Sequence, residues 1–237
     1  MADYNAAELR REQEFQVLAA ETQQYNEEID QWIAALKTSD PYAVREYMSL
    51  VLERMQIIED YDGKANVGLL PASSHLVVDY FLPDVSIIPD HSSFIYNKTR
   101  RVINGKATAP KERRSKYADV LAQSALAILS TIFRADRTNA IQCITLNGMI
   151  DTTDRSTGRD AKVCVFSVRA DRDTFEILNL RRVNAIDCLR NLKAFVSRSP
   201  DELQPVKPIL ELNMTDPRFI ESGDVLSTLI SAQILWI

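Results

Sequence analysis

The apolar positions in the first forty residues repeat with alternating spacings of three and four. The repeat consists of Phe15, Leu18, Thr22, Tyr25, Ile29, Trp32 and Leu36. Such a heptad pattern predicts one long helix with a single apolar seam, in which Thr22 is the weak position. The pattern leaves open whether the seam pairs with another helix or packs on its own domain. The oligomerisation candidates are Phe15, Leu18, Tyr25, Ile29, Trp32 and Leu36.

A second helix is predicted directly after the first. Asp40 is a favourable N-cap and Pro41 suits the first helical position, so we expect a helix to begin there. Residues 1–60 contain thirteen acidic and five basic side chains. We therefore interpret residues 1–60 as an acidic helical arm with a heptad-like seam.

Strand-like sequence follows the arm. His75–Leu82, Val85–Ile88 and Ser92–Tyr96 are rich in β-branched and aromatic residues and are separated by prolines, which predicts a small antiparallel meander. Further along, Ala140–Ile150 and Ala161–Ala170 predict a hairpin whose loop is made of turn-forming residues.

A long helix with apolar positions at helical spacing should begin near Pro110, between the meander and the hairpin. Together these elements predict an α+β fold with a long N-terminal helical arm and a small antiparallel sheet that has helices packed on one face. The α+β domain is expected to span residues 61–229, and residues 230–237 to form a divergent apolar tail.

The composition is that of an ordinary globular protein, with 46% apolar and 26% charged residues and a net charge of −5. Cys143, Cys164 and Cys188 have no CxxC spacing, which favours buried thiols in a reducing compartment. No secretory signal is evident, and the unbroken apolar runs are shorter than the ~18 residues of a membrane helix. We therefore expect a cytoplasmic protein without a membrane partner.

Motifs for metals and nucleotides are incomplete. The two histidines, His75 and His91, have no partners at ligand spacing. Neither Gly63-Lys64 nor Gly105-Lys106 has the preceding glycine and the following hydroxyl residue of a P-loop. The sequence therefore predicts no metal site and no cofactor.

A nuclease-like pattern occurs around the predicted hairpin. Metal-dependent nucleases hold Mg²⁺ with acids at strand ends and place a lysine near the attacking water. Asp160 and Lys162 are two residues apart, so they face the same side of a strand, and Asp151 precedes them. The alternative is that these are solvated acids of a turn-rich loop. The weak catalytic candidates are Asp151, Asp160 and Lys162.

Residues 97–116 contain eight basic side chains and one acidic side chain. Such a run can neutralise the phosphates of DNA or RNA, and the flanking Tyr96 and Tyr117 could stack on bases. The alternative is a solvated loop and helix start, or an intramolecular partner for the acidic arm. The nucleic-acid-binding candidates are Arg100, Arg101, Lys111, Arg113, Arg114 and Lys116.

Five segments of the chain resemble those of a known protein family. They are Ala43–Arg54, Val78–Pro83, Ile132–Arg137, Asn147–Arg159 and Val196–Ile220. They resemble the non-catalytic N-terminal region of Mrr-type restriction endonucleases, and the resemblance covers most of the chain. In that family a nuclease domain with an acid-acid-lysine motif follows this region. Here an apolar tail follows instead, so the resemblance assigns no catalytic residue. The basic run is also more continuous than in the family.

The resemblance implies a non-catalytic sensing, regulatory or assembly domain of a restriction or phage-defence system. Such a domain would act by self-association or with a protein partner such as a separate nuclease effector. The residues themselves leave two alternatives: a nucleic-acid-binding domain that uses residues 97–116, or a small Mg²⁺-dependent nuclease. Under the first two hypotheses this chain alone is not an enzyme.

Overall fold

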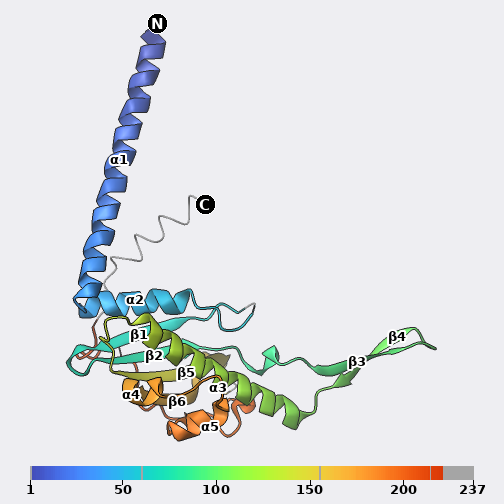
Figure 1. The fold of residues 1–237 in the computed structure, drawn as a ribbon. Helices are drawn as coiled ribbons and strands as arrows, with labels where there is room; N and C mark the ends of the chain where they lie inside the picture. Colours follow the sequence, from blue (N-terminus) through green and yellow to red (C-terminus); the bar gives the residue numbers. More distant parts are fainter. Residues whose placement is uncertain (1, 60, 155, 214, 221–237) are drawn as a thin grey trace.

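The computed structural model describes residues 2–59, 61–154, 156–213 and 215–220, so the predicted tail lies outside the described residues (Figure 1). Within them, five strands form a mixed sheet in the order β1-β2-β5-β6-β7, and two more strands form a separate hairpin. The strands are β1 (Ala65–Leu70), β2 (His75–Phe81), β3 (His91–Asn97), β4 (Val102–Ala107), β5 (Cys143–Thr153), β6 (Asp160–Asp171) and β7 (Phe195–Val196). The helices are α1 (Ala2–Lys37), α2 (Pro41–Glu53), α3 (Pro110–Ala135), α4 (Arg172–Glu176) and α5 (Ala185–Asn191). The fold is α+β, as predicted.

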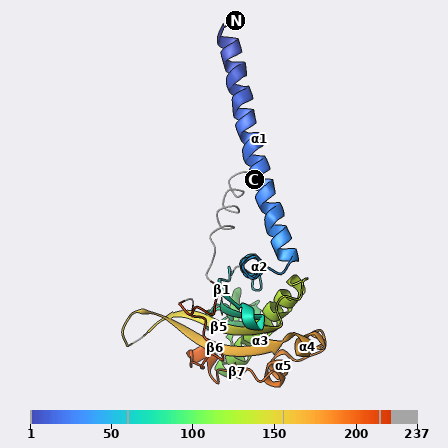
Figure 2. The same cartoon turned by 90° about the vertical axis from the view of Figure 1, so that its left-hand side faces the viewer.

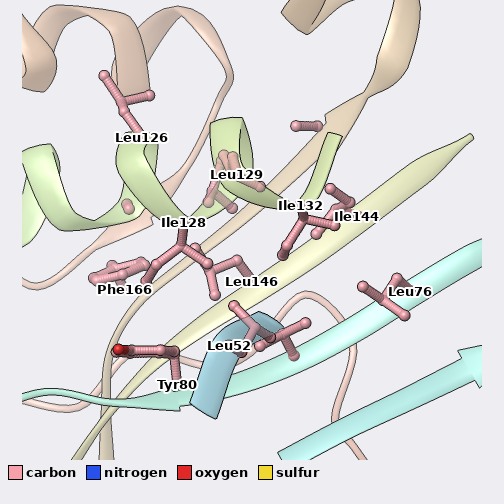
Figure 3. Packing of buried hydrophobic residues seen from close by; sticks show 14 of the residues in the cluster. Leu52, Leu76, Tyr80, Leu126, Ile128, Leu129, Ile132, Ile144, Leu146 and Phe166 are labelled. Carbon is pink, nitrogen blue, oxygen red and sulfur yellow. The ribbon is translucent and has the colours of Figure 1, made fainter. Parts of the chain in front are cut away.

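One face of the five-stranded sheet packs against α2 and α3 and forms the core (Figure 3). Tyr80 of β2 and Leu146 of β5 meet Leu52 of α2 and Ile132 of α3 there, and all four side chains are almost completely buried. A helix whose apolar positions repeat every 3.6 residues has its apolar side chains along one side. In α2 and α3 this side packs against the sheet and is buried.

The first two helices end and begin where the sequence predicts. α1 ends at Lys37, and the Asp40 carboxylate caps α2 by accepting the backbone N–H groups of Tyr42 and Ala43. Met48 of α2 is part of the core. α2 therefore belongs to the compact domain, and α1 alone forms the projecting part of the predicted arm.

The opposite face of the sheet is covered by the extended C-terminal segment of the described chain. The Asn147 side-chain amide donates to the carbonyl oxygen of Leu210 (3.0 Å) and to the carboxylate of Asp79 (2.8 Å). The Ser167 hydroxyl donates to Asn147 (2.7 Å) and accepts the backbone N–H of Ile209 (2.9 Å). Burial raises the pKa of Asp79, although the bond from Asn147 opposes this shift. This polar cluster of Asp79, Asn147 and Ser167 fixes the segment to the sheet.

The predicted antiparallel meander is wrong. β2 pairs with β5 in parallel, with His75 opposite Cys143. Val85–Ile87 forms a 3₁₀ turn, because the Asp84 carboxylate accepts the backbone N–H of Ser86 and closes the chain locally. β3 pairs instead with β4, a strand that lies within the basic run expected to be a loop and helix start.

The predicted long hairpin is confirmed. β5 and β6 pair antiparallel, and Gly158 in the connecting turn has a φ of 68°, which glycine adopts without steric cost. Both strands extend further toward the turn than predicted, whereas β5 begins at Cys143 instead of Ala140. Asp151 therefore lies on β5 and Asp160 on β6, instead of in the turn-rich loop.

Within the described residues, α3 is the helix that is long and apolar enough to cross a membrane. Half of its most apolar stretch is buried inside the domain, where Ile128 and Leu129 have no exposed surface. Core helices of this length meet the same criteria, and α3 packs as one of them.

Candidate interaction sites on two projecting elements

α1 projects from the domain as a single helix (Figures 1 and 2). Its 36 residues correspond to about 54 Å at ~1.5 Å of rise per residue. Phe15 and Leu18 are 72% and 56% exposed. The weak seam position, Thr22, satisfies its hydroxyl within the helix by donating to the carbonyl oxygen of Leu18 (2.7 Å). The outer half of the seam is therefore an apolar surface that the described residues leave uncovered.

The inner end of the seam packs on the domain. The ring of Trp32 meets that of Tyr47 edge-on, with 6.0 Å between centroids, and Leu36 packs against the core. A groove of about 500 Å³ lies here between α1, α2 and the end of α3. The buried indole N–H of Trp32 has no hydrogen-bond partner among the described residues. The prediction that the seam packs on its own domain therefore holds for the inner end, at Trp32 and Leu36. Pairing of the outer part with another helix stays a prediction.

Tyr25 and Ile29 lie between these two parts of the seam and are partly exposed. All six oligomerisation candidates lie on α1. Trp32 and Leu36 contact the domain, and the other four, from Phe15 to Ile29, lie further out along the helix. The part of the seam from Phe15 to Ile29 is hereafter called the outer seam.

The β3–β4 hairpin is the second projecting element, inserted in the chain between β2 and α3 (Figure 1). Its turn forms because the side-chain oxygen of Asn97 accepts the backbone N–H groups of Thr99 (3.1 Å) and Arg100 (3.0 Å). Arg101 completes the turn with a φ of 52°. The turn places both arginines at the tip of the ribbon.

Apolar side chains lie on both faces of this hairpin. Tyr96 is paired with Ile103, and Phe94 lies two residues along, so these three share one face. Phe94 and Ile103 are 68% and 70% exposed. Ile95 and Val102 lie on the other face and are also exposed. Neither face is covered by the described part of the chain.

The structure divides the six nucleic-acid-binding candidates of the basic run into two groups. The first group consists of Arg113, Arg114 and Lys116 on α3, each of which pairs with an acid. The partners are Asp90 for Arg113, Asp201 and Glu202 for Arg114, and Glu112 for Lys116. These acids all lie outside residues 1–60. The acidic arm is therefore not the intramolecular partner of these three basic residues.

The second group consists of Arg100 and Arg101 at the hairpin tip and Lys111 at the start of α3. Among the described residues, these three form no ion pair with an acidic side chain. Residues 91–111 contain five basic residues and no acidic residue. The hairpin is therefore a positively charged ribbon, and the cations at its tip are available to a ligand.

The weak catalytic candidates share one face of the β5–β6 ladder. Asp151 is directly opposite Lys162, and Asp160 is two residues before Lys162. All three side chains are exposed, and the Lys162 ammonium lies 4.8 Å from the centroid of the Phe81 ring. Among the described residues, no three His, Cys, Asp or Glu side chains are grouped to hold a metal ion. The geometry does not favour the nuclease alternative.

Two features of this arrangement are missed by sequence reasoning. The strand β4 has a local signal in the β-branched pair Val102-Ile103, although Asn104-Gly105, which lies inside the strand, is a turn-forming sequence. The polar cluster of Asp79, Asn147 and Ser167 has none, because its members come from three different strands.

No known protein family, curated protein or solved structure matches the chain. The structure thus defines an α+β domain with two projecting elements.

Proposed function

We propose that the chain is a non-catalytic assembly domain of a restriction or phage-defence system, which self-associates through α1 and acts with a separate effector in the cytoplasm. The exposed outer seam carries the proposal. A lone helix in water gains little from its intrinsic propensity, so α1 would be stabilised by burying that seam. The defence context is supported by the resemblance of segments such as Val196–Ile220 to Mrr-type proteins.

Light scattering on the full-length chain at several concentrations tests the assembly role. We expect the mass of a dimer or larger species. Leu18→Ser should lower the mass towards that of a monomer, because Leu18 lies on the outer seam. Val17→Ser is the matched control, since Val17 is 57% exposed but lies off the seam. A strict monomer at every concentration would contradict the proposal.

Phage plating tests the defence role separately. The chain is expressed in a bacterial host with the product of a neighbouring reading frame, and plating efficiency is compared with that of the Leu18→Ser variant. Protection that requires both proteins and an intact Leu18 supports the proposal. Equal plating on all strains would count against it.

A second candidate function is nucleic-acid binding through the β3–β4 hairpin. Two observations favour it: residues 91–111 contain no acid, and the arginines at the tip form no ion pair within the described part of the chain. The major groove of a DNA duplex admits a two-stranded ribbon, and arginines can neutralise its phosphates. Both functions are compatible in one protein, because the helix and the hairpin are separate elements.

A further inference from the structure

We propose that two copies of the chain pair their α1 helices in parallel and in register, as a two-stranded coiled coil. This inference rests on the proposed role of α1 in self-association and adds the identity, direction and register of the partner helix. It is carried by the side chains on either side of the outer seam.

The seam occupies the a and d positions of a heptad. Within the outer seam, Phe15, Thr22 and Ile29 take the a positions, and Leu18 and Tyr25 take the d positions. Trp32 and Leu36 continue the repeat but pack on the chain's own domain. Isoleucine or valine at a and leucine at d favour two parallel strands. Ile29 at a and Leu18 at d follow this rule, whereas Phe15, Thr22 and Tyr25 do not.

The two edges of the seam differ in charge. Glu14, Glu21 and Glu28 occupy successive g positions, whereas the e positions hold Ala19, Asn26 and Ile33, none of which is charged. In a parallel pair, each g residue faces the e residue of the next heptad in the other helix. Glu21 would then face Asn26 of the second copy, and no glutamate at g would face another.

An antiparallel pair would bring the same edges together, g against g and e against e. The row containing Glu14, Glu21 and Glu28 would face its own copy, and like charges at this distance repel. The charge pattern therefore permits a second copy in the parallel direction and disfavours the antiparallel one.

Other observations fit a second copy as the occupant. Ile33 is an e residue that remains 38% exposed at the inner end of the helix, beside the groove lined by Trp32 and Leu36. In the parallel pair it would meet the aliphatic stem of Glu28 of the second copy. Both domains would then lie at the same end of the coiled coil, and so would both basic hairpins.

Cysteine cross-linking of the full-length chain tests direction and register. Thr22→Cys and Ile29→Cys are prepared as separate variants, and each should form a disulfide-linked dimer on mild oxidation. Thr22 and Ile29 can both meet their own counterparts only in a parallel, in-register pair. An antiparallel pair could link at most one of these two positions. Ala20→Cys, at the outward f position, is the control and should stay unlinked. The native cysteines are all buried and should not compete.

Charge substitution at Asn26 provides a second measurement. Asn26→Lys should tighten the dimer and Asn26→Glu should weaken it, each by about fivefold in the dissociation constant, since every dimer contains two contacts between residue 26 and Glu21. Opposite effects of the two substitutions support parallel pairing.

Linkage at one of the two seam positions alone, equal linkage at Ala20, or the same direction of change for both Asn26 variants would overturn the parallel arrangement while leaving self-association intact. A monomeric wild-type chain would instead overturn the proposed function itself.

Discussion

The Nη2 atom of Arg172 lies 2.5 Å from the Oδ2 atom of Asp136, in the interior of the domain. The two residues are 6% and 4% exposed. The Asp136 carboxylate also accepts the backbone N–H groups of Ala140 (3.1 Å) and Ile141 (2.8 Å). This ion pair therefore joins the end of α3, the loop that leads to β5 and the start of α4.

Replacing Asp136 by alanine should destabilise the protein by about 3–5 kcal/mol, because the Arg172 guanidinium stays buried without its main counter-charge. Urea unfolding followed by circular dichroism measures the change. Asp187→Ala is the matched control. Asp187 pairs with Arg190 on the surface, so its loss should cost less than about 1 kcal/mol. Equal effects of the two variants would contradict the structural role of the buried pair.

Replacing Arg100 and Arg101 together by alanine should weaken binding of duplex DNA and lower the slope of log affinity against log salt by about 2, since two phosphate contacts are lost. Fluorescence anisotropy at several salt concentrations measures both quantities. Arg114→Ala is the control within the same basic run, because Arg114 pairs with Asp201 and Glu202. It should leave the salt slope unchanged. DNA binding that is independent of the tip arginines would exclude the hairpin as the interface.

Asp79→Asn should make the protein more stable at neutral pH. Burial raises the pKa of Asp79, so the folded state holds this proton more tightly than the unfolded state does. The resulting stability is complete below the unfolded pKa of the carboxyl and is lost as the pH rises through the folded pKa. Asparagine is uncharged and keeps an oxygen that can accept the bond from Asn147. Urea titrations at pH 7.5 should show a gain for the variant, and this gain should shrink towards pH 4. A loss of stability at pH 7.5 would show that the charged form is the favoured one.

The cysteines should be unreactive in the folded protein. Burial raises the pKa of Cys143 to about 11 and that of Cys164 to about 12, and it also raises the pKa of Cys188. Thiolate is the reactive form, and little of it exists at pH 8. A chromogenic disulfide reagent should therefore react slowly with the native chain and rapidly after denaturation. Rapid modification of a native cysteine would mean that the surrounding core opens readily.

Local signals in the sequence were sufficient for several elements. The 3,4 spacing of α1, the cap at Asp40, the proline at Pro110 and the turn formers around Gly158 each act within a few residues. They predicted three helices and one hairpin. The pairing of strands that are distant in the sequence was not predicted correctly. The sequence indicated an antiparallel meander, whereas β2 pairs in parallel with β5.

The candidate sites also divide into properties that the sequence determined and properties that only the tertiary structure decided. Sequence alone determined that the seam exists and that residues 97–116 are basic, because both are properties of side-chain order. Only the tertiary structure decided which of these groups are free. Trp32 packs on α2 while Leu18 does not, and Arg114 finds acids near residue 200 while Arg100 lies at the tip of a ribbon. Availability depends on contacts between distant segments, and those contacts follow from packing of the whole domain.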